Sequence, residues 1–123
     1  MRMKKLLITL MLISPASFAD WGDVYYCQMT NFSDTSLEGK RTDYILGKFQ
    51  FKLDETKNAM IFGKGGSFDN YEMELEKAGA YPSQETWWAD SSIAKLYFKE
   101  GKFLYASVGG IQARVVSANC DKF

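Results

Sequence analysis

The sequence predicts an all-β protein, a single domain of antiparallel strands closed into a small barrel. Three observations predict this class. Apolar and polar residues alternate with a period of two along most of the chain, which is typical of half-buried strands. The links between these segments are too short for the helix that a parallel crossover requires. Two cysteines, Cys27 and Cys120, lie in the first and last of the segments.

The start of the 123-residue chain follows the plan of a secretory signal peptide. A basic stretch (Met1–Lys5) precedes an apolar run of eight residues (Leu6–Ile13), and Ser17–Ala19 places small residues before an expected cleavage site. The run is shorter than the ~20 residues of a membrane-spanning helix. We therefore expect residues 1–19 to be a signal peptide and residues 20–123 to be a soluble barrel domain, periplasmic or extracellular.

Charge and composition exclude several function classes. Without Arg2, Lys4 and Lys5, the 15 basic residues fall to 12 against 15 acidic ones, a net charge of −3. Nucleic-acid binding normally requires a basic face. The chain has no histidine, the commonest metal ligand and a frequent general base. We expect no catalytic residue, no metal, no cofactor, no nucleic-acid partner and no membrane insertion.

Eight strands are expected, and most are rich in Tyr, Phe, Trp, Val or Ile, which favour extended backbone. The second alternates most clearly, with Phe49, Phe51 and Leu53 on one face and polar side chains on the other. In chain order, the strands are expected at Val24–Thr30, Lys48–Leu53, Ala59–Gly63, Tyr71–Glu76, Glu85–Ala89, Ile93–Lys99, Lys102–Val108 and Gln112–Cys120.

The links between these segments predict hairpins. Glu100-Gly101 and Gly109-Gly110 are two-residue links on either side of the seventh strand, and Asp54–Asn58 separates the second from the third. The polar segment Asn31–Thr42 is expected to be the longest connector. Consecutive strands should therefore pair antiparallel.

The cysteines favour closure of the sheet. Closure removes exposed edges and places the first strand beside the last, where Cys27 and Cys120 could form a disulfide, which needs Cα atoms within ~7 Å. An open meander would keep these strands at opposite edges. A β-sandwich with Greek-key links would also bring them together and is the alternative. Because the pair lacks C-x-x-C spacing, a structural disulfide is expected.

The interior of the barrel is expected to be filled. A barrel of eight strands has room for its own side chains or for one small ligand, and most residues expected to point inward are large. Any function would then lie on the loops or the outer wall. The expected inward residues are Phe49, Phe51, Leu53, Met60, Phe62, Tyr71, Met73, Leu75, Trp88, Leu96, Phe98, Leu104 and Val116.

Trp87 and Trp88 are the most conspicuous candidates for a contact site. Adjacent residues of a strand point to opposite faces, and parity favours Trp88 in the core and Trp87 on the outer wall with Tyr97. Exposed aromatic clusters mark interaction sites. Trp87, Trp88 and Tyr97 are therefore the candidate contact residues for a ligand or a protein partner.

Glu72, Glu74 and Glu76 form an acidic row on one strand face. We expect this row to be solvated and paired with Lys48 and Lys52 on a neighbouring strand. A catalytic carboxyl group would need an apolar setting, and a calcium site would need a loop of Asp or Asn ligands.

The glycine-rich segment Gly63–Ser67 is expected to be a flexible link. It lacks the spacing of a phosphate-binding loop, and no helix is predicted to follow it.

The residues Tyr25-Tyr26-Cys27 resemble the opening strand of the periplasmic inhibitors of c-type lysozyme, which are also small disulfide-linked barrels. The resemblance covers these few residues. The Ser-Gly-x-x-Tyr inhibitory loop of that family is absent, and Gly66–Tyr71 reads Gly-Ser-Phe-Asp-Asn-Tyr instead. The predicted barrel is similar to lipocalin-type and avidin-type barrels in strand count alone.

Many aromatics and no evident catalytic group predict an exported, non-enzymatic binding module. The first hypothesis is protein–protein contact, with inhibition of a hydrolase as its specific form. The alternative is a small lipocalin-like carrier of an apolar or glycan ligand, and a carboxylate-dependent hydrolase ranks third. An aromatic-lined cavity of ~300 Å³ or more would favour the carrier, whereas a solid core would remove it. An outer-membrane barrel is disfavoured because its strands need ~9–11 residues each.

Overall fold

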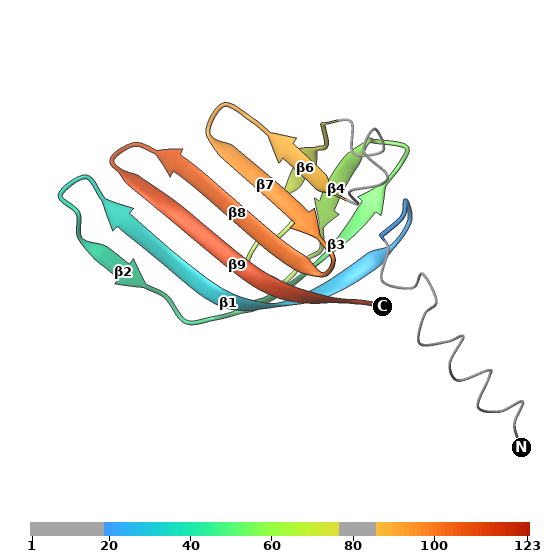
Figure 1. Cartoon of the computed structure of the whole chain (residues 1–123), viewed down its shortest axis with the longest axis horizontal. Helices are drawn as coiled ribbons and strands as arrows, with labels where there is room; N and C mark the ends of the chain where they lie inside the picture. The colour runs from blue at the N-terminus through green and yellow to red at the C-terminus, as the bar shows by residue number, and fades with distance from the viewer. Residues whose placement is uncertain (1–18, 77–85) are drawn as a thin grey trace, which may run out of the picture.

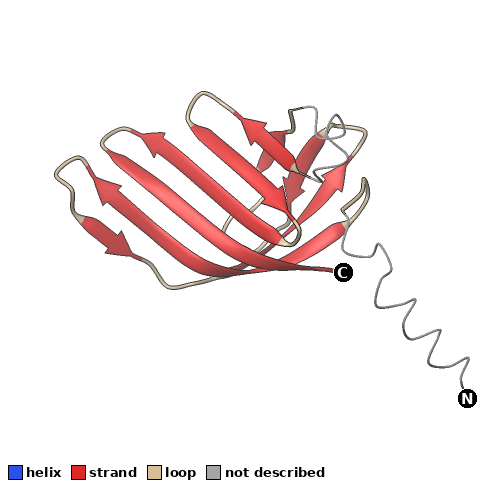
Figure 2. Ribbon diagram, viewed as in Figure 1, coloured by secondary structure: helices blue, strands red, loops and turns tan. Residues whose placement is uncertain are grey.

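The computed structural model describes residues 19–76 and 86–123, and every regular element in these ranges is a strand (Figure 1, Figure 2). No helix long and apolar enough to cross a membrane occurs in them. The strands are β1 (Val24–Ser36), β2 (Arg41–Asp43), β3 (Lys48–Asp54), β4 (Ala59–Phe62), β5 (Glu72–Glu74), β6 (Trp87–Asp90), β7 (Ala94–Lys99), β8 (Lys102–Gly109) and β9 (Gln112–Lys122).

All of these strands belong to one antiparallel sheet that is nearly closed into a barrel. The order is β5-β4-β3-β1-β9-β8-β7-β6, with β2 paired to the second half of β1. The ends of the sheet meet where the Glu76 N–H donates to the Trp88 carbonyl oxygen at 2.8 Å. The predicted class is confirmed. The seam lies between β5 and β6, and the first and last strands are paired along their length.

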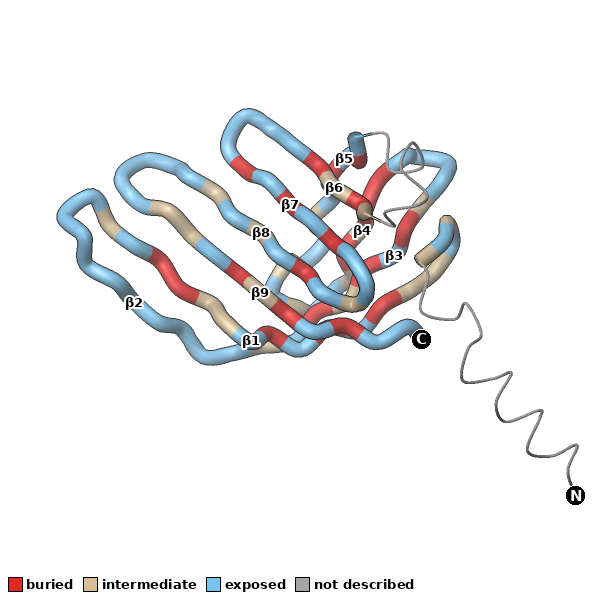
Figure 3. The backbone as a smooth tube through the Cα atoms, viewed as in Figure 1, coloured by how far each residue is buried: buried red, intermediate tan, exposed pale blue. Residues whose placement is uncertain are grey.

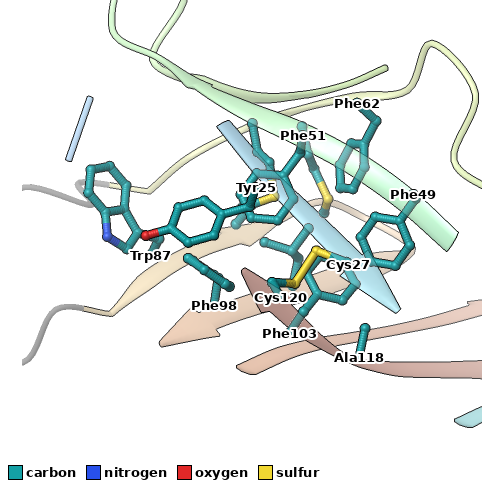
Figure 4. Close-up of a cluster of buried hydrophobic side chains, with 14 of the residues drawn as sticks. Tyr25, Cys27, Phe49, Phe51, Phe62, Trp87, Phe98, Phe103, Ala118 and Cys120 are labelled. Carbon is teal, nitrogen blue, oxygen red and sulfur yellow. A yellow bond between two sulfur atoms is a disulfide. The ribbon is translucent and has the colours of Figure 1, made fainter. Parts of the chain in front are cut away.

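The disulfide joins the first strand to the last, as predicted. Cys27 lies opposite Cys120 in the β1–β9 pairing, with their Cα atoms 4.0 Å apart and their sulfur atoms bonded. Both side chains belong to the buried core (Figure 4). The predicted structural disulfide is confirmed, and it is compatible with an oxidising, exported location.

Large side chains fill the interior. On β3, Phe49, Phe51 and Leu53 are buried, as the alternation predicts. The rings of Phe49 and Phe51 pack with those of Phe62, Phe98 and Phe103, and centroids of contacting pairs in this group lie 4.8–6.1 Å apart (Figure 4). Such aromatic pairs add to the apolar burial that stabilises the fold.

Two expected inward residues point outward instead. Trp87 is 6% exposed and packs edge-to-face on Trp21, whereas Trp88 is only half-buried. Phe103 is buried, and its neighbour Leu104 is 47% exposed. The reason is register, because Trp87 lies opposite Phe98 and Phe98 lies opposite Phe103, which forms one inward row across β6, β7 and β8.

The expected connector Asn31–Thr42 is largely strand. β1 continues to Ser36, and after a turn Arg41–Asp43 forms β2 against it. A bulge between Met29 and Asn31 shifts the β1–β9 register. An extra residue in one strand reverses the side-chain parity of the residues that follow it. Phe32 and Asp34 therefore lie on the same inner face as Met29, although they are an odd number of residues away from it. The polar composition of this segment therefore does not make it a loop.

The acidic row also differs from expectation. Glu72 and Glu74 are exposed, but β5 pairs with β4 and not with β3. Glu72 accordingly forms an ion pair with Lys57, at 3.4 Å, instead of one with Lys48 or Lys52. The row is solvated, as expected, with a different cation beside it.

Candidate functional site

An aromatic cleft opens where the inner face of the sheet continues beyond the packed core. β1, β8 and β9 extend past the buried residues toward exposed hairpin ends (Figure 3). The cleft has a volume of about 370 Å³. We call it the barrel-mouth cleft, and its lining residues are Met29, Phe32, Ser67, Phe68, Asp69, Tyr71, Tyr105, Arg114 and Val116.

The turn after β4 supplies one wall. Gly65, with φ of +81°, and Asn70, with φ of +57°, adopt left-handed backbone in this turn. The Gly65 N–H donates to Asp69 Oδ1 at 2.7 Å, and the Tyr71 N–H donates to the Phe68 carbonyl at 2.9 Å. Gly66 lies so close to β3 that a Cβ would be 3.0 Å from the Phe49 Cα. The glycines of this segment thus allow the turn to fold over β3 and to direct Phe68 inward.

Three rings form the aromatic wall. Phe68 lies 5.0 Å from Tyr105 and 6.0 Å from Tyr71, measured between centroids, and Tyr71 lies 6.3 Å from Tyr105. Phe68 also packs on Phe49 and Phe62, so the wall continues into the core. Burial, with a contribution from Tyr105, raises the pKa of Tyr71 to about 12. The Tyr71 phenol is therefore a neutral hydroxyl group at physiological pH.

A buried carboxylate fixes the cation at the opposite wall. Asp34 is 4% exposed, and its oxygens accept hydrogen bonds from Arg114 Nε at 2.8 Å and Arg114 Nη2 at 3.1 Å. The Tyr44 hydroxyl donates to the same carboxylate at 2.7 Å, and Gln112 Nε2 donates to it at 3.2 Å. Arg114 Cζ also lies 5.2 Å from the Phe32 ring centroid.

The electrostatics of this cluster follow from these bonds. The hydrogen bonds from Arg114 lower the pKa of Asp34 against the opposing effect of burial, and the bond from Tyr44 adds to the lowering. The same contacts raise the pKa of Arg114 and of Tyr44. Asp34 uses two of the five N–H bonds of the guanidinium. The cleft thus holds a permanent cation whose position is fixed.

The candidate contact residues from the sequence lie elsewhere. Trp88 stacks on Tyr97 across the β6–β7 pairing, with centroids 6.2 Å apart and ring planes at 14°. Tyr97 lies opposite Leu104 on β8, and these two side chains are 44% and 47% exposed. We call Trp88, Tyr97 and Leu104 the outer-wall row. Trp87 is not part of it, because Trp87 points into the core.

Sequence reasoning missed most of the barrel-mouth cleft. The sequence predicts a connector where Phe32 and Asp34 lie, and it marks neither Arg114 nor Tyr105 as a site residue. Local patterning gives no signal here, because Phe32 is the only apolar residue of Asn31–Ser36 and the segment shows no apolar–polar alternation. The pairing of Asp34 with Arg114 depends on the bulge, which no local pattern in the sequence marks.

A second hollow lies on the outer wall between β1, β3 and β9. It measures about 440 Å³ and is lined mainly by polar side chains, including Gln28, Lys48, Gln50 and Lys64. None of the groups with shifted pKa values described above lines it. Perturbed ionisable groups and convergent apolar walls favour the barrel-mouth cleft as the binding site.

Metal binding finds no support in the described ranges, where no group of three His, Cys, Asp or Glu side chains is placed to hold an ion. Comparison with protein-family models, with curated proteins and with solved structures finds no match to this chain. The function must therefore be argued from the cleft and the outer wall.

Proposed function

We propose that the protein is a non-enzymatic binding module and that the barrel-mouth cleft is its recognition site. One observation carries the proposal, namely an aromatic cleft of about 370 Å³ with a fixed arginine on its wall. Its size lies within the range of small-ligand sites, which combine apolar walls with a few placed polar groups. The barrel interior itself is filled, but this cleft at its mouth has the size of a carrier site, and it therefore favours the carrier hypothesis over protein–protein contact.

The lining selects the chemistry of the ligand. Phe68, Tyr71 and Tyr105 offer ring faces and edges to an apolar, ring-bearing body. Arg114 offers N–H donors that are not used by Asp34, and guanidinium groups bind carboxylate or sulfonate oxygens strongly. The ligand class is thus a ring-bearing amphiphile with one hydrogen-bond-accepting acidic group.

A matched pair of fluorescent probes tests this assignment. Anilinonaphthalene sulfonate and phenylnaphthylamine have the same rings, and only the first carries an anion. We expect both to bind saturably, the sulfonate more tightly. Arg114→Gln should weaken sulfonate binding ~10-fold, the loss of about one charge-assisted hydrogen bond, and change amine binding less than ~2-fold.

Two further variants control the experiment. Asp69→Asn removes a negative charge from the rim and keeps an acceptor for Gly65, so it should strengthen sulfonate binding. Trp88→Ala, on the outer-wall row, should affect neither probe. Thermal unfolding of each variant excludes exposed core as the source of fluorescence. Equal sulfonate binding by the parent protein and Arg114→Gln would refute the role of the cleft arginine.

Protein–protein contact is the second candidate, supported by the outer-wall row. Trp88, Tyr97 and Leu104 form an exposed apolar row across three strands, and aromatic residues are enriched in interaction hot spots. Inhibition of an envelope or foreign hydrolase is the specific form. Affinity capture from envelope lysate, with Trp88→Ala as bait control and a hydrolase assay on the captured protein, tests it. Capture that is identical for both baits, or no inhibition, would contradict it.

Export is part of the same proposal. The disulfide supports an oxidising location, but the expected signal peptide falls almost entirely on residues 1–18, which lie outside the described ranges. Mass spectrometry of the protein recovered from the periplasm or medium should give an N-terminus at Asp20. An intact Met1 in that fraction would contradict cleavage.

A further inference from the structure

We propose that β2 is a pairing edge for a second copy of this chain. All three residues of β2 are exposed, and in the described part of the chain β2 pairs with β1 alone. Figure 1 shows β2 at the margin of the sheet, away from the barrel seam. Strands at such margins present backbone groups that can pair with another strand.

The β1–β2 hydrogen bonds show which backbone groups face away from the sheet. The Tyr44 N–H donates to the Phe32 carbonyl, and the Lys40 carbonyl accepts from the Ser36 N–H, each at 2.8 Å. In an antiparallel ladder, alternate residues of a strand bond to the same neighbour. Lys40, Thr42 and Tyr44 therefore face β1, whereas the N–H and C=O groups of Arg41 and Asp43 point outward.

The sequence Arg41-Thr42-Asp43 is complementary to itself. A two-fold axis through Thr42 places Arg41 of each copy opposite Asp43 of the other, with both residues bonding through their outward backbone groups. Opposite charges stabilise such cross-strand pairs, and an isologous interface uses each pair twice. A register centred on Asp43 would instead oppose two carboxylates, so the charges select the first register.

The present partners of these side chains do not prevent this pairing. Arg41 and Asp43 form an ion pair at 2.8 Å within the chain, with side chains 60% and 69% exposed, and Arg41 Nη2 also donates an exposed hydrogen bond to Asn31 Oδ1 at 3.2 Å. Exposed ion pairs of this kind contribute little free energy. Ile45, which is 93% exposed, and Leu46 follow directly and add apolar surface next to the edge. This surface is separate from the cleft, so the inference does not rest on the proposed ligand.

Sedimentation of the disulfide-bonded protein over a range of concentrations tests the proposal. We expect a monomer–dimer equilibrium. Arg41→Asp and Asp43→Arg should each raise the dissociation constant at least ~10-fold, because each turns two attractive pairs into repulsive ones. The double variant Arg41→Asp with Asp43→Arg should restore it to within ~3-fold, because the charges are again complementary.

A matched control uses another exposed ion pair, that of Lys57 with Glu72. Lys57→Glu reverses a charge of similar exposure beside Glu72, far from β2 in the sheet order, and it should leave the dissociation constant unchanged. Thermal unfolding shows that each variant is folded. A monomer at every concentration up to ~1 mM, the weak end of specific association, would overturn the proposal. A dissociation constant that is unchanged by Arg41→Asp would also overturn it, as would a double variant that stays monomeric.

Discussion

Arg114 binds Asp34 through two hydrogen bonds of 2.8 and 3.1 Å, and the two residues lie directly opposite each other in the β1–β9 pairing. The pair sits where the sheet leaves the packed core. Asp34 is buried and accepts hydrogen bonds from Arg114, Tyr44 and Gln112, and the arginine is the cation among these three partners. The Asp34–Arg114 pair thus stabilises the extended part of the sheet and also forms the polar wall of the cleft.

Removal of Arg114 should destabilise the protein. Arg114→Met leaves Asp34 with Tyr44 and Gln112 as donors, and an under-satisfied buried acceptor costs about 1–3 kcal/mol. Urea denaturation should show this loss in the free energy of unfolding. Lys95→Met, at an exposed cation on β7, is the control and should change it by less than ~0.5 kcal/mol. Equal effects of the two substitutions would contradict the role of Asp34.

Asp34 should also make stability fall in acid. Its pKa is lowered in the folded state, so its contribution is present above the unfolded-state pKa of about 3.9. As the pH falls below that value, the unfolded chain binds the proton first and stability decreases until the folded pKa is passed. The difference between the parent protein and Asp34→Asn, measured by denaturation, should shrink below pH ~4. A constant difference would contradict the lowered pKa.

Tyr71 should be among the last tyrosines to ionise. Burial raises its pKa to about 12, against about 10 for a free phenol. Because the unfolded state ionises first, the Tyr71 contribution to stability should be lost as the pH rises from about 10 through the folded value. Alkaline absorbance titration should show a late component that Tyr71→Phe removes. Tyr97→Phe, on the outer wall, should leave that component in place.

The disulfide should stabilise the fold strongly. It closes a sequence separation of 93 residues, which in the chain-entropy model is worth ~4–5 kcal/mol, with measured values often lower. Replacing both cysteines by alanine should therefore lower the unfolding free energy by ~2–5 kcal/mol. Reductant should lower the melting temperature of the parent protein and leave that of the variant unchanged.

Trp87 and Trp88 should behave differently. Trp87 is buried against Trp21, so Trp87→Ala should cost ~3–5 kcal/mol. Trp88 is half-buried on the outer wall, so Trp88→Ala should cost less than ~1.5 kcal/mol. Acrylamide should quench Trp88 fluorescence more than that of Trp87, in variants that carry Trp21→Phe and keep one of the two. Stronger quenching of Trp87 would contradict this assignment and would support the orientation expected from the sequence.

The fold could be predicted because local alternation and the cysteine positions act together. Phe49, Phe51 and Leu53 fix the inner face of β3, and the linked Cys27 and Cys120 require the first and last strands to be neighbours. Trp87 could not be oriented in this way, because a pair of adjacent aromatic residues fits either parity. Only its register against Phe98 decides the matter.

The cleft could not be predicted because it depends on long-range pairing. Asp34 and Arg114 are far apart in sequence, and the bulge after Met29 sets which faces they share. A carboxylate in a polar segment has the appearance of a solvated loop residue until its partner is known. Phe68 likewise sits in a glycine-rich turn whose inward course is fixed by contacts with β3.

Backbone amide NMR during titration with anilinonaphthalene sulfonate tests the central claim most directly. We predict saturable shift changes at residues 67–71, at Tyr105 and at Arg114–Val116, all of which line or flank the cleft. The indole signal of Trp88 should not move. Changes centred on Trp88, Tyr97 and Leu104, with the cleft residues unaffected, would contradict the account.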